Sequence, residues 1–199
     1  MGLSKKTIRD VPLDNRTVLV RVDFDVPIDK TGVIINDVRI KATLPTIQHL
    51  LDRGCKVVII SHLGSPDGQN TDYSLEPVAL RLAQLLKLDI RFVEGTIGDK
   101  VLQAVKRAPN NSIVVLQNLR FHSGEDANDS DFAMKIANST GARYFIQESP
   151  DIVWRSFAST DAITMYIPSV AGLLLEREFE KILYAVNLPG IKNLLDART

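Results

Sequence analysis

Five short segments rich in apolar residues recur along the chain, and they predict buried β-strands. They span residues 18–22, 56–61, 90–93, 113–116 and 142–147. Most of them read as continuous hydrophobic runs rather than as alternating ones, which is typical of strands covered on both faces of a parallel sheet. We therefore expect a central sheet with other elements packed on both of its sides.

Segments with apolar residues at helical spacing lie between the predicted strands. In the clearest of them, 75–86, Leu75, Val78 and Leu82 would share one face, which is the pattern of an amphipathic helix. The other predicted helices run from a cap at Asn36-Asp37 to Gly54, and over 98–107, 132–138 and 173–187.

Strands that alternate with helices predict the α/β class. The expected architecture is a three-layer α/β/α domain with a doubly wound parallel sheet of the Rossmann-like type. No repeat, low-complexity segment or linker divides residues 1–187, which we therefore interpret as one domain.

Composition narrows the function classes. The 24 basic and 24 acidic residues cancel, which argues against a nucleic-acid or membrane-surface binder. No 18-residue apolar run predicts a membrane span. The single cysteine, Cys55, excludes an intramolecular disulfide and suits a reducing compartment. We expect a cytoplasmic protein, with the interior of an organelle as the alternative.

Charged side chains follow three of the predicted strands. Asp23 and Asp25 come after the first strand, His62 after the second and Arg120 after the fourth. In a parallel sheet these strand ends share the edge where ligands bind. Arg39 begins the first helix, whose terminal N–H groups also favour an anion. The pattern predicts a site for a phosphorylated or carboxylated small molecule, with scattered surface arginines as the alternative.

Six ordered motifs resemble a known family. They are VRVDFDVP, NDVRIKATLPTIQHLLDRG, VVIISHLGSP, YSLEPVALRLAQLL, QNLRF and IPSVAGLLLEREFE, and they extend over residues 18–180. The chain resembles the N-terminal, 3-phosphoglycerate-binding domain of phosphoglycerate kinase. Several motifs in one order are far more specific than a single glycine pattern. The resemblance implies the fold of that domain and a crevice for 3-phosphoglycerate.

The resemblance also implies roles for the matched residues. Asp23 would hold the substrate hydroxyl, and His62 and Arg120 would hold its phosphate or carboxylate. Arg39 would be the arginine that stabilises the transferred phosphoryl group in the transition state. Arg155 matches a further substrate-binding arginine. No metal ligand set is expected.

Several of the matched site positions depart from the family pattern. The family's Asn in DFNVP is Asp25 here, the Arg of HLGRP is Ser65, and the Glu of ENLRF is Gln117. A charge-assisted hydrogen bond is worth about 1.5–3 kcal/mol. Losing two or three of them and adding a carboxylate would cost on the order of 4–8 kcal/mol of anion binding.

A second departure affects the segment 147–157. Arg155 remains, but the family's flanking histidines are Trp154 and Phe157, and Glu148 and Asp151 also occur here. The two aromatic residues form a partner-facing patch in one interpretation. In the other they fill the crevice as part of the core.

Nothing in the sequence resembles the family's nucleotide-binding domain. No glycine-rich phosphate loop occurs, so we expect no cofactor unless a nucleotide domain supplies ATP or ADP and Mg²⁺ in trans. Residues 188–199 resemble the LPGVxxLS tail of full-length members, which would pack back on the domain. The acidic cluster Glu125, Asp126, Asp129 and Asp131 predicts a solvated helix N-terminus.

These observations lead to two hypotheses. The first is a degenerate, catalytically inactive phosphoglycerate kinase-like domain with Arg39 as a remnant, acting through a protein partner in a larger assembly. The alternative is the 3-phosphoglycerate-binding half of a kinase that converts ATP and 3-phosphoglycerate to ADP and 1,3-bisphosphoglycerate with a nucleotide domain in trans, or a 3-phosphoglycerate sensor. Any remaining anion binding would be weak.

Overall fold

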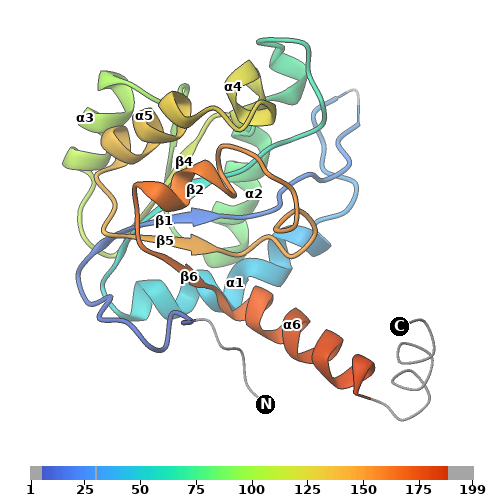
Figure 1. The fold of residues 1–199 in the computed structure, drawn as a ribbon. Coiled ribbons are helices and arrows are strands. Elements are labelled where there is room, and N and C mark those ends of the chain that lie inside the picture. The colour runs from blue at the N-terminus through green and yellow to red at the C-terminus, as the bar shows by residue number, and fades with distance from the viewer. Residues whose placement is uncertain (1–5, 30, 188–199) are drawn as a thin grey trace.

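The described residues form one parallel sheet with helices on both faces. The computed structural model describes residues 6–29 and 31–187 (Figure 1). Within them, six strands lie in the order β3-β4-β2-β1-β5-β6, and every neighbouring pair is parallel. The strands are β1 (Thr17–Arg21), β2 (Lys56–Ile60), β3 (Ile90–Val93), β4 (Ser112–Leu116), β5 (Tyr144–Gln147) and β6 (Ser169–Ala171).

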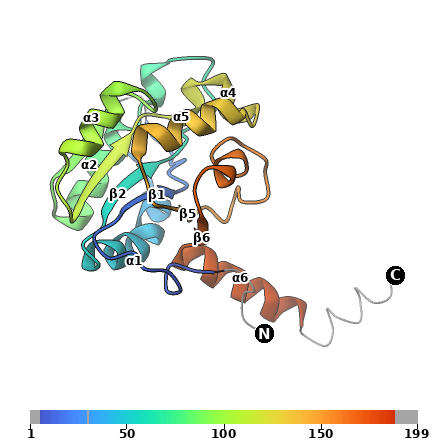
Figure 2. The same cartoon turned by 60° about the vertical axis from the view of Figure 1, so that its left-hand side comes forward.

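The predicted α/β/α architecture is confirmed by the helices. One core cluster packs α1 (Val38–Asp52) and α2 (Glu76–Leu86) against one face of the sheet. A second packs α3 (Asp99–Arg107) and α5 (Ser130–Thr140) against the other. Figure 2 shows α3 and α5 on the side of the sheet opposite α1. Alternate strand residues enter the two clusters because successive side chains of a strand point to opposite faces.

The sixth strand was not predicted from the sequence. β6 has three residues and pairs with β5 at the edge of the sheet. Only Val170 and Ala171 of this strand are buried, so it lacks the apolar run that identified the others. Its pairing aligns Val170 with Ile146, which places the next element, α6 (Leu173–Val186), beside the end of β5.

The helix α6 lies against α1 and then extends away from the sheet (Figure 1). Leu175 is its one buried residue. Phe179, Ile182 and Val186, at spacings of three and four, are exposed and form what we call the α6 stripe. A helix normally buries such a stripe against another element.

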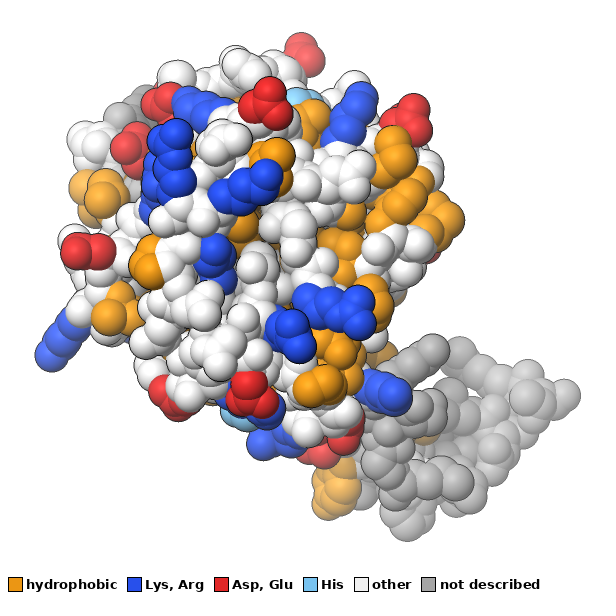
Figure 3. Space-filling view, turned by 90° about the vertical axis from the view of Figure 1, so that its left-hand side faces the viewer, with side chains coloured by type: hydrophobic (Ala, Val, Ile, Leu, Met, Phe, Trp, Pro, Cys, Tyr) orange, Lys and Arg blue, Asp and Glu red, His pale blue; other side chains and the backbone are white. Residues whose placement is uncertain are grey.

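The surface carries both signs of charge. On the face shown in Figure 3, Lys and Arg side chains lie among acidic and apolar ones. Within residues 6–29 and 31–187 there is no helix with the length and apolarity needed to cross a bilayer. The predicted tail at 188–199 lies outside the described residues.

Candidate active-site crevice

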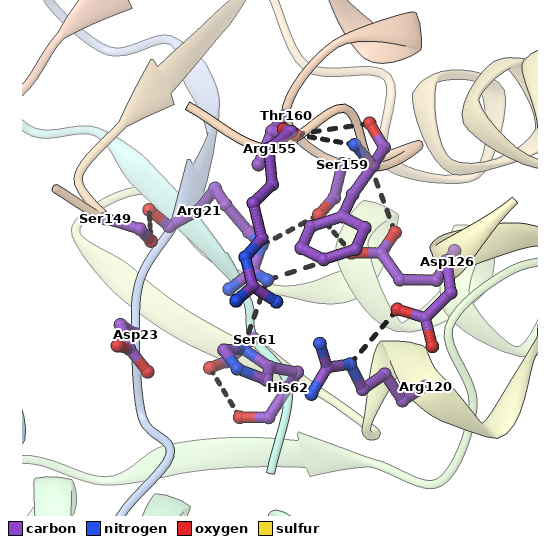
Figure 4. A network of polar contacts seen from close by, with 12 residues as sticks. Arg21, Asp23, Ser61, His62, Arg120, Asp126, Ser149, Arg155, Ser159 and Thr160 are labelled. Atoms are coloured by element: carbon purple, nitrogen blue, oxygen red, sulfur yellow. Dashed lines mark hydrogen bonds and ion pairs between the residues drawn. The ribbon is translucent and has the colours of Figure 1, made fainter. Parts of the chain in front are cut away.

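The carboxyl ends of β1, β2, β4 and β5 bring the predicted site residues to one edge of the sheet (Figure 4). Asp23 follows β1, His62 follows β2, and Arg120 lies in the short helical turn after β4. Asp23 and His62 are buried. The sheet edge therefore assembles residues that are distant in sequence, as the strand-end pattern predicts.

Arg39 is engaged by two carboxylates at this edge. Its Nη1 donates to Oδ2 of Asp23 and lies 3.4 Å from Oδ2 of Asp151. Burial raises the pKa of Asp23 although the N–H of Asp25 and the Arg39 charge both lower it. The Arg39 guanidinium therefore already has anionic partners within the protein.

Next to these residues, a cavity of about 360 Å³ is lined by residues of both α1 and α6. Asp23 and Arg39 lie on one wall, and Arg177, Glu178 and Ile182 of α6 lie on the other. Its lining thus mixes both charges with apolar surface and includes part of the α6 stripe.

Arg120 is held by the protein itself. Its Nη1 donates to the backbone oxygen of Gly64 at 2.7 Å, and its Nε donates to Asp126 at 3.2 Å. Its guanidinium lies over the ring of Phe157, 5.5 Å from the centroid. Ser65 contributes only a hydroxyl, 3.3 Å from Nη1. Arg120 is therefore in the predicted place, with most of its donors already paired.

Asp25 adds a partly exposed carboxylate to the crevice. Its Oδ1 accepts the N–H of Gly64 at 2.7 Å, and its Oδ2 lies 3.8 Å from Nε2 of His62. The loop after β2 thus fixes this side chain beside the histidine. An anionic ligand at His62 would meet the Asp25 charge at short range.

The two aromatic residues of the 147–157 segment separate in the structure. Trp154 is 70% exposed, its Nε1 donates to the backbone oxygen of Asp151, and the guanidinium of Arg155 lies 4.7 Å from its ring centroid. Phe157 is only 9% exposed and packs under Arg120. The prediction of a partner-facing side chain is therefore wrong for Phe157, because its ring fills the space beneath the guanidinium.

Sequence analysis missed a buried polar cluster below the crevice. Arg21, at the end of β1, pairs with Glu125 at 3.7 Å, and both side chains are 1% exposed. The prediction of a solvated helix N-terminus is therefore wrong for Glu125, whereas Asp129 caps α5 through the N–H of Phe132. Arg21 inside an apolar strand was the available signal, because a buried cation requires an anionic partner.

Glu148, which belongs to the 147–157 segment that departs from the family pattern, lies beneath α6. It is fully buried, accepts a hydrogen bond from the hydroxyl of Thr46, and accepts the N–H of Leu174 at 3.1 Å. Burial raises its pKa to about 7. Gly172 lies so close that a Cβ there would overlap the carboxylate. Glu148 therefore fixes the start of α6.

No group of three or more His, Cys, Asp or Glu side chains that could hold a metal ion occurs in the part of the chain that the structure describes. Oxygen ligands of the kind Mg²⁺ prefers would have to converge. At this crevice Asp23 and Asp151 instead converge on Arg39.

Comparisons with known proteins match the chain to one family. The family model described as phosphoglycerate kinase matches residues 8–192. The phosphoglycerate kinase of Dictyoglomus turgidum is 42% identical over 190 residues, which cover 94% of this chain and 47% of that protein. The enzyme of Microcystis aeruginosa is 42% identical over 193 residues, covering 94% and 48%. The chain thus spans about half the length of the curated relatives it matches.

Solved structures show the same relationship. Phosphoglycerate kinase from Pyrococcus horikoshii OT3 superimposes with a TM-score of 0.84 at 29% identity, over 92% of this chain and 46% of that one. The enzyme from Coxiella burnetii gives a TM-score of 0.81 at 29% identity, over 93% and 46%. The resemblance and the fold inferred from the motifs are confirmed, and the chain belongs to the phosphoglycerate kinase family.

Proposed function

We propose that this chain is a degenerate, catalytically inactive phosphoglycerate kinase domain that acts through a protein partner. The observation that carries the proposal is the state of Arg39. The resemblance assigns this arginine to the transferred phosphoryl group, and here it is paired with Asp23 and Asp151. Both carboxylates contact Nη1, so a phosphoryl group that binds this nitrogen would have to compete with them.

The negative charge of Asp25 also supports an inactive site, because it repels an anionic ligand. Two unit charges 4 Å apart interact by about 4 kcal/mol at an effective dielectric constant of about 20. An anionic ligand group at that distance from Asp25 would therefore bind about 10³-fold more weakly than beside a neutral amide. This penalty suffices to turn a micromolar site into a millimolar one.

The α6 stripe and Trp154 supply the surface for a partner. Phe179, Ile182 and Val186 lie on one side of a helix that extends beyond the sheet. Exposed apolar side chains grouped in this way favour docking of another apolar surface. Trp154, stacked under Arg155, is the residue type most enriched among interface hot spots. Because the matched relatives are about twice as long, a companion domain is one candidate for this partner.

A second function is favoured by the basic side of the crevice. His62, Arg120 and Arg155 lie close together in Figure 4, and the charges of the two arginines act on the His62 imidazole. A carboxylate or phosphate could bind among them. In this reading the chain is the 3-phosphoglycerate-binding half of a kinase. ATP or ADP and Mg²⁺ would then be held by a nucleotide domain, which would also be required to align the phosphoryl group for transfer.

Calorimetric titration of the full chain with 3-phosphoglycerate separates the two functions. We expect no binding tighter than millimolar, and a micromolar dissociation constant would overturn the first proposal. Asp25→Asn is the matched variant, because an amide oxygen can still accept the N–H of Gly64. The Asp25→Asn variant should bind 3-phosphoglycerate at least tenfold more tightly than the wild type does. Equal affinities would contradict the electrostatic argument.

A further inference from the structure

A buried arginine lies beneath the crevice and contacts the ring of His62 (Figure 4). Arg21 is the last residue of β1 and is almost completely buried. Its Nη2 lies 3.2 Å from Nδ1 of His62, and its Nε donates to Oγ of Ser159 at 2.8 Å. Its Nη1 donates to the backbone oxygen of Val22. Each nitrogen of the guanidinium therefore has a partner, and one of these partners is the imidazole.

Glu125 and Ser159 together hold this guanidinium in place. Glu125 lies 3.7 Å from Nη2, and it accepts both the hydroxyl of Ser159 and, at 3.1 Å, the N–H of Ser159. Arg21 comes from β1, Glu125 from α4 (Ser123–Asp126), and Ser159 from the loop after β5. All three are buried. Because three separate segments meet on one guanidinium, its orientation is fixed by the tertiary structure.

The contact with Arg21 determines which nitrogen of His62 carries the proton. An arginine side chain has only donors, so Nδ1 must accept the hydrogen bond and the ring proton must lie on Nε2. Nε2 lies on the side of the ring that faces Asp25, 3.8 Å from its carboxylate. The N–H of His62 is therefore directed toward the crevice.

We propose that Arg21 is a positioning residue that holds His62 as the neutral tautomer with its N–H directed toward the crevice. A ligand oxygen at this position would meet a neutral donor rather than a cation. Its charge would then have to be balanced by the arginines, which keep their charge at all relevant pH values. The statement about a ligand rests on the second candidate function, whereas the protonation state of His62 does not.

The charges around His62 act in the same direction. Burial lowers its pKa to about 2, and Arg21, Arg120, Arg39 and Arg155 contribute to this lowering. These four arginines come from four segments, namely β1, the turn after β4, α1 and the loop after β5. The carboxylate that faces the ring is Asp25, which follows β1, and Glu125 lies behind Arg21. The four cations outweigh Asp25, which is partly exposed. Protonation of the ring is therefore disfavoured.

NMR of the full chain labelled with ¹⁵N-histidine tests this inference without any ligand. Long-range ¹H–¹⁵N correlations distinguish the two neutral tautomers from the charged ring. Between pH 5 and 8, His62 should show protonated Nε2, unprotonated Nδ1 and no titration. A titration midpoint in that range, or a proton on Nδ1, would overturn the proposal. Signals are assigned with His49→Gln and His122→Gln.

A pair of variants then identifies the cause. Arg21→Met combined with Glu125→Gln removes the guanidinium without leaving a buried carboxylate unpaired. The pKa of His62 should then be higher than in the wild type, and the ring should populate both neutral tautomers. Glu125→Gln alone is the matched control, since Arg21 still faces the ring, and its His62 signals should match the wild type. If the double variant keeps the wild-type tautomer, Arg21 is not responsible.

The two proposals can fail separately. Absence of 3-phosphoglycerate binding in the calorimetric titration leaves the tautomer of His62 as a property of the ligand-free chain. A charged or titrating His62 would refute the positioning role of Arg21 while leaving the affinity measurement unchanged. If the double variant does not fold, the wild-type spectra alone still decide the protonation state.

Discussion

Replacing the buried carboxylate of Glu148 should change the pH dependence of stability. Glu148 lies beneath the first turn of α6 and accepts hydrogen bonds from Thr46 and Leu174. Those hydrogen bonds lower its pKa, but burial raises it by more, from 4.5 to about 7. The folded state therefore binds this proton more tightly than the unfolded state does.

The direction and size of the pH effect on stability follow from the difference between the folded and unfolded pKa values of Glu148. A carboxyl whose pKa is higher in the folded state binds more protons there, so stability falls as pH rises between the two pKa values. The shift from 4.5 to about 7 corresponds to about 3 kcal/mol, since one pKa unit is about 1.36 kcal/mol. The wild type should lose this amount between about pH 4.5 and 7. The Glu148→Gln variant keeps a neutral hydrogen-bond acceptor and should not lose this stability.

Urea unfolding at pH 5 and pH 8, followed by far-UV circular dichroism, measures this effect. Other groups titrate over the same range, so the difference between variant and wild type is the relevant quantity. Relative to the wild type, Glu148→Gln should gain about 3 kcal/mol of unfolding free energy between pH 5 and pH 8. Glu180→Gln, on the exposed part of α6, is the control and should show no such gain. Equal pH profiles for Glu148→Gln and the wild type would refute the reasoning.

Three further predictions concern packing, and chemical denaturation checks each of them. Phe157→Ala should lower the unfolding free energy by about 3–5 kcal/mol because a buried ring is lost, whereas Trp154→Ala should change it by less than about 0.5 kcal/mol; similar losses would contradict the assigned burial. Leu175→Ala should cost about 2–5 kcal/mol, but Ile182→Glu should leave stability within about 0.5 kcal/mol, because only Leu175 is buried in α6. A large loss for Ile182→Glu would mean that the α6 stripe is covered in the free chain. Gly172→Ala should destabilise the protein by about 1–3 kcal/mol through overlap with the buried carboxylate, and an unchanged midpoint would exclude that contact.

Local sequence patterns determined most of the fold. The runs at 18–22, 56–61, 90–93 and 113–116 became β1 to β4 with small differences at their ends, because continuous apolar runs have few alternatives to a covered strand. Helix periodicity located α1 to α3, α5 and α6 for the same reason. β6 was not predicted, because three edge residues with little buried surface carry no such pattern.

The position of the crevice could also be predicted, since the ends of parallel strands share one edge of the sheet. Asp23, Asp25, His62 and Arg120 do meet there. The family motifs added Arg155, which no local pattern had distinguished from other surface arginines.

Only the tertiary structure determined which of these charged side chains remain available to a ligand and which are paired within the protein. Sequence order gives no measure of the distance from Arg39 to Asp151, or from Arg21 to Glu125, because those pairs come from different segments of the chain. Burial likewise separates Phe157 from Trp154 although they are three residues apart. Pairing and desolvation of a charge depend on every neighbour within a few ångströms, and those neighbours are chosen by the packing of the sheet rather than by the local sequence.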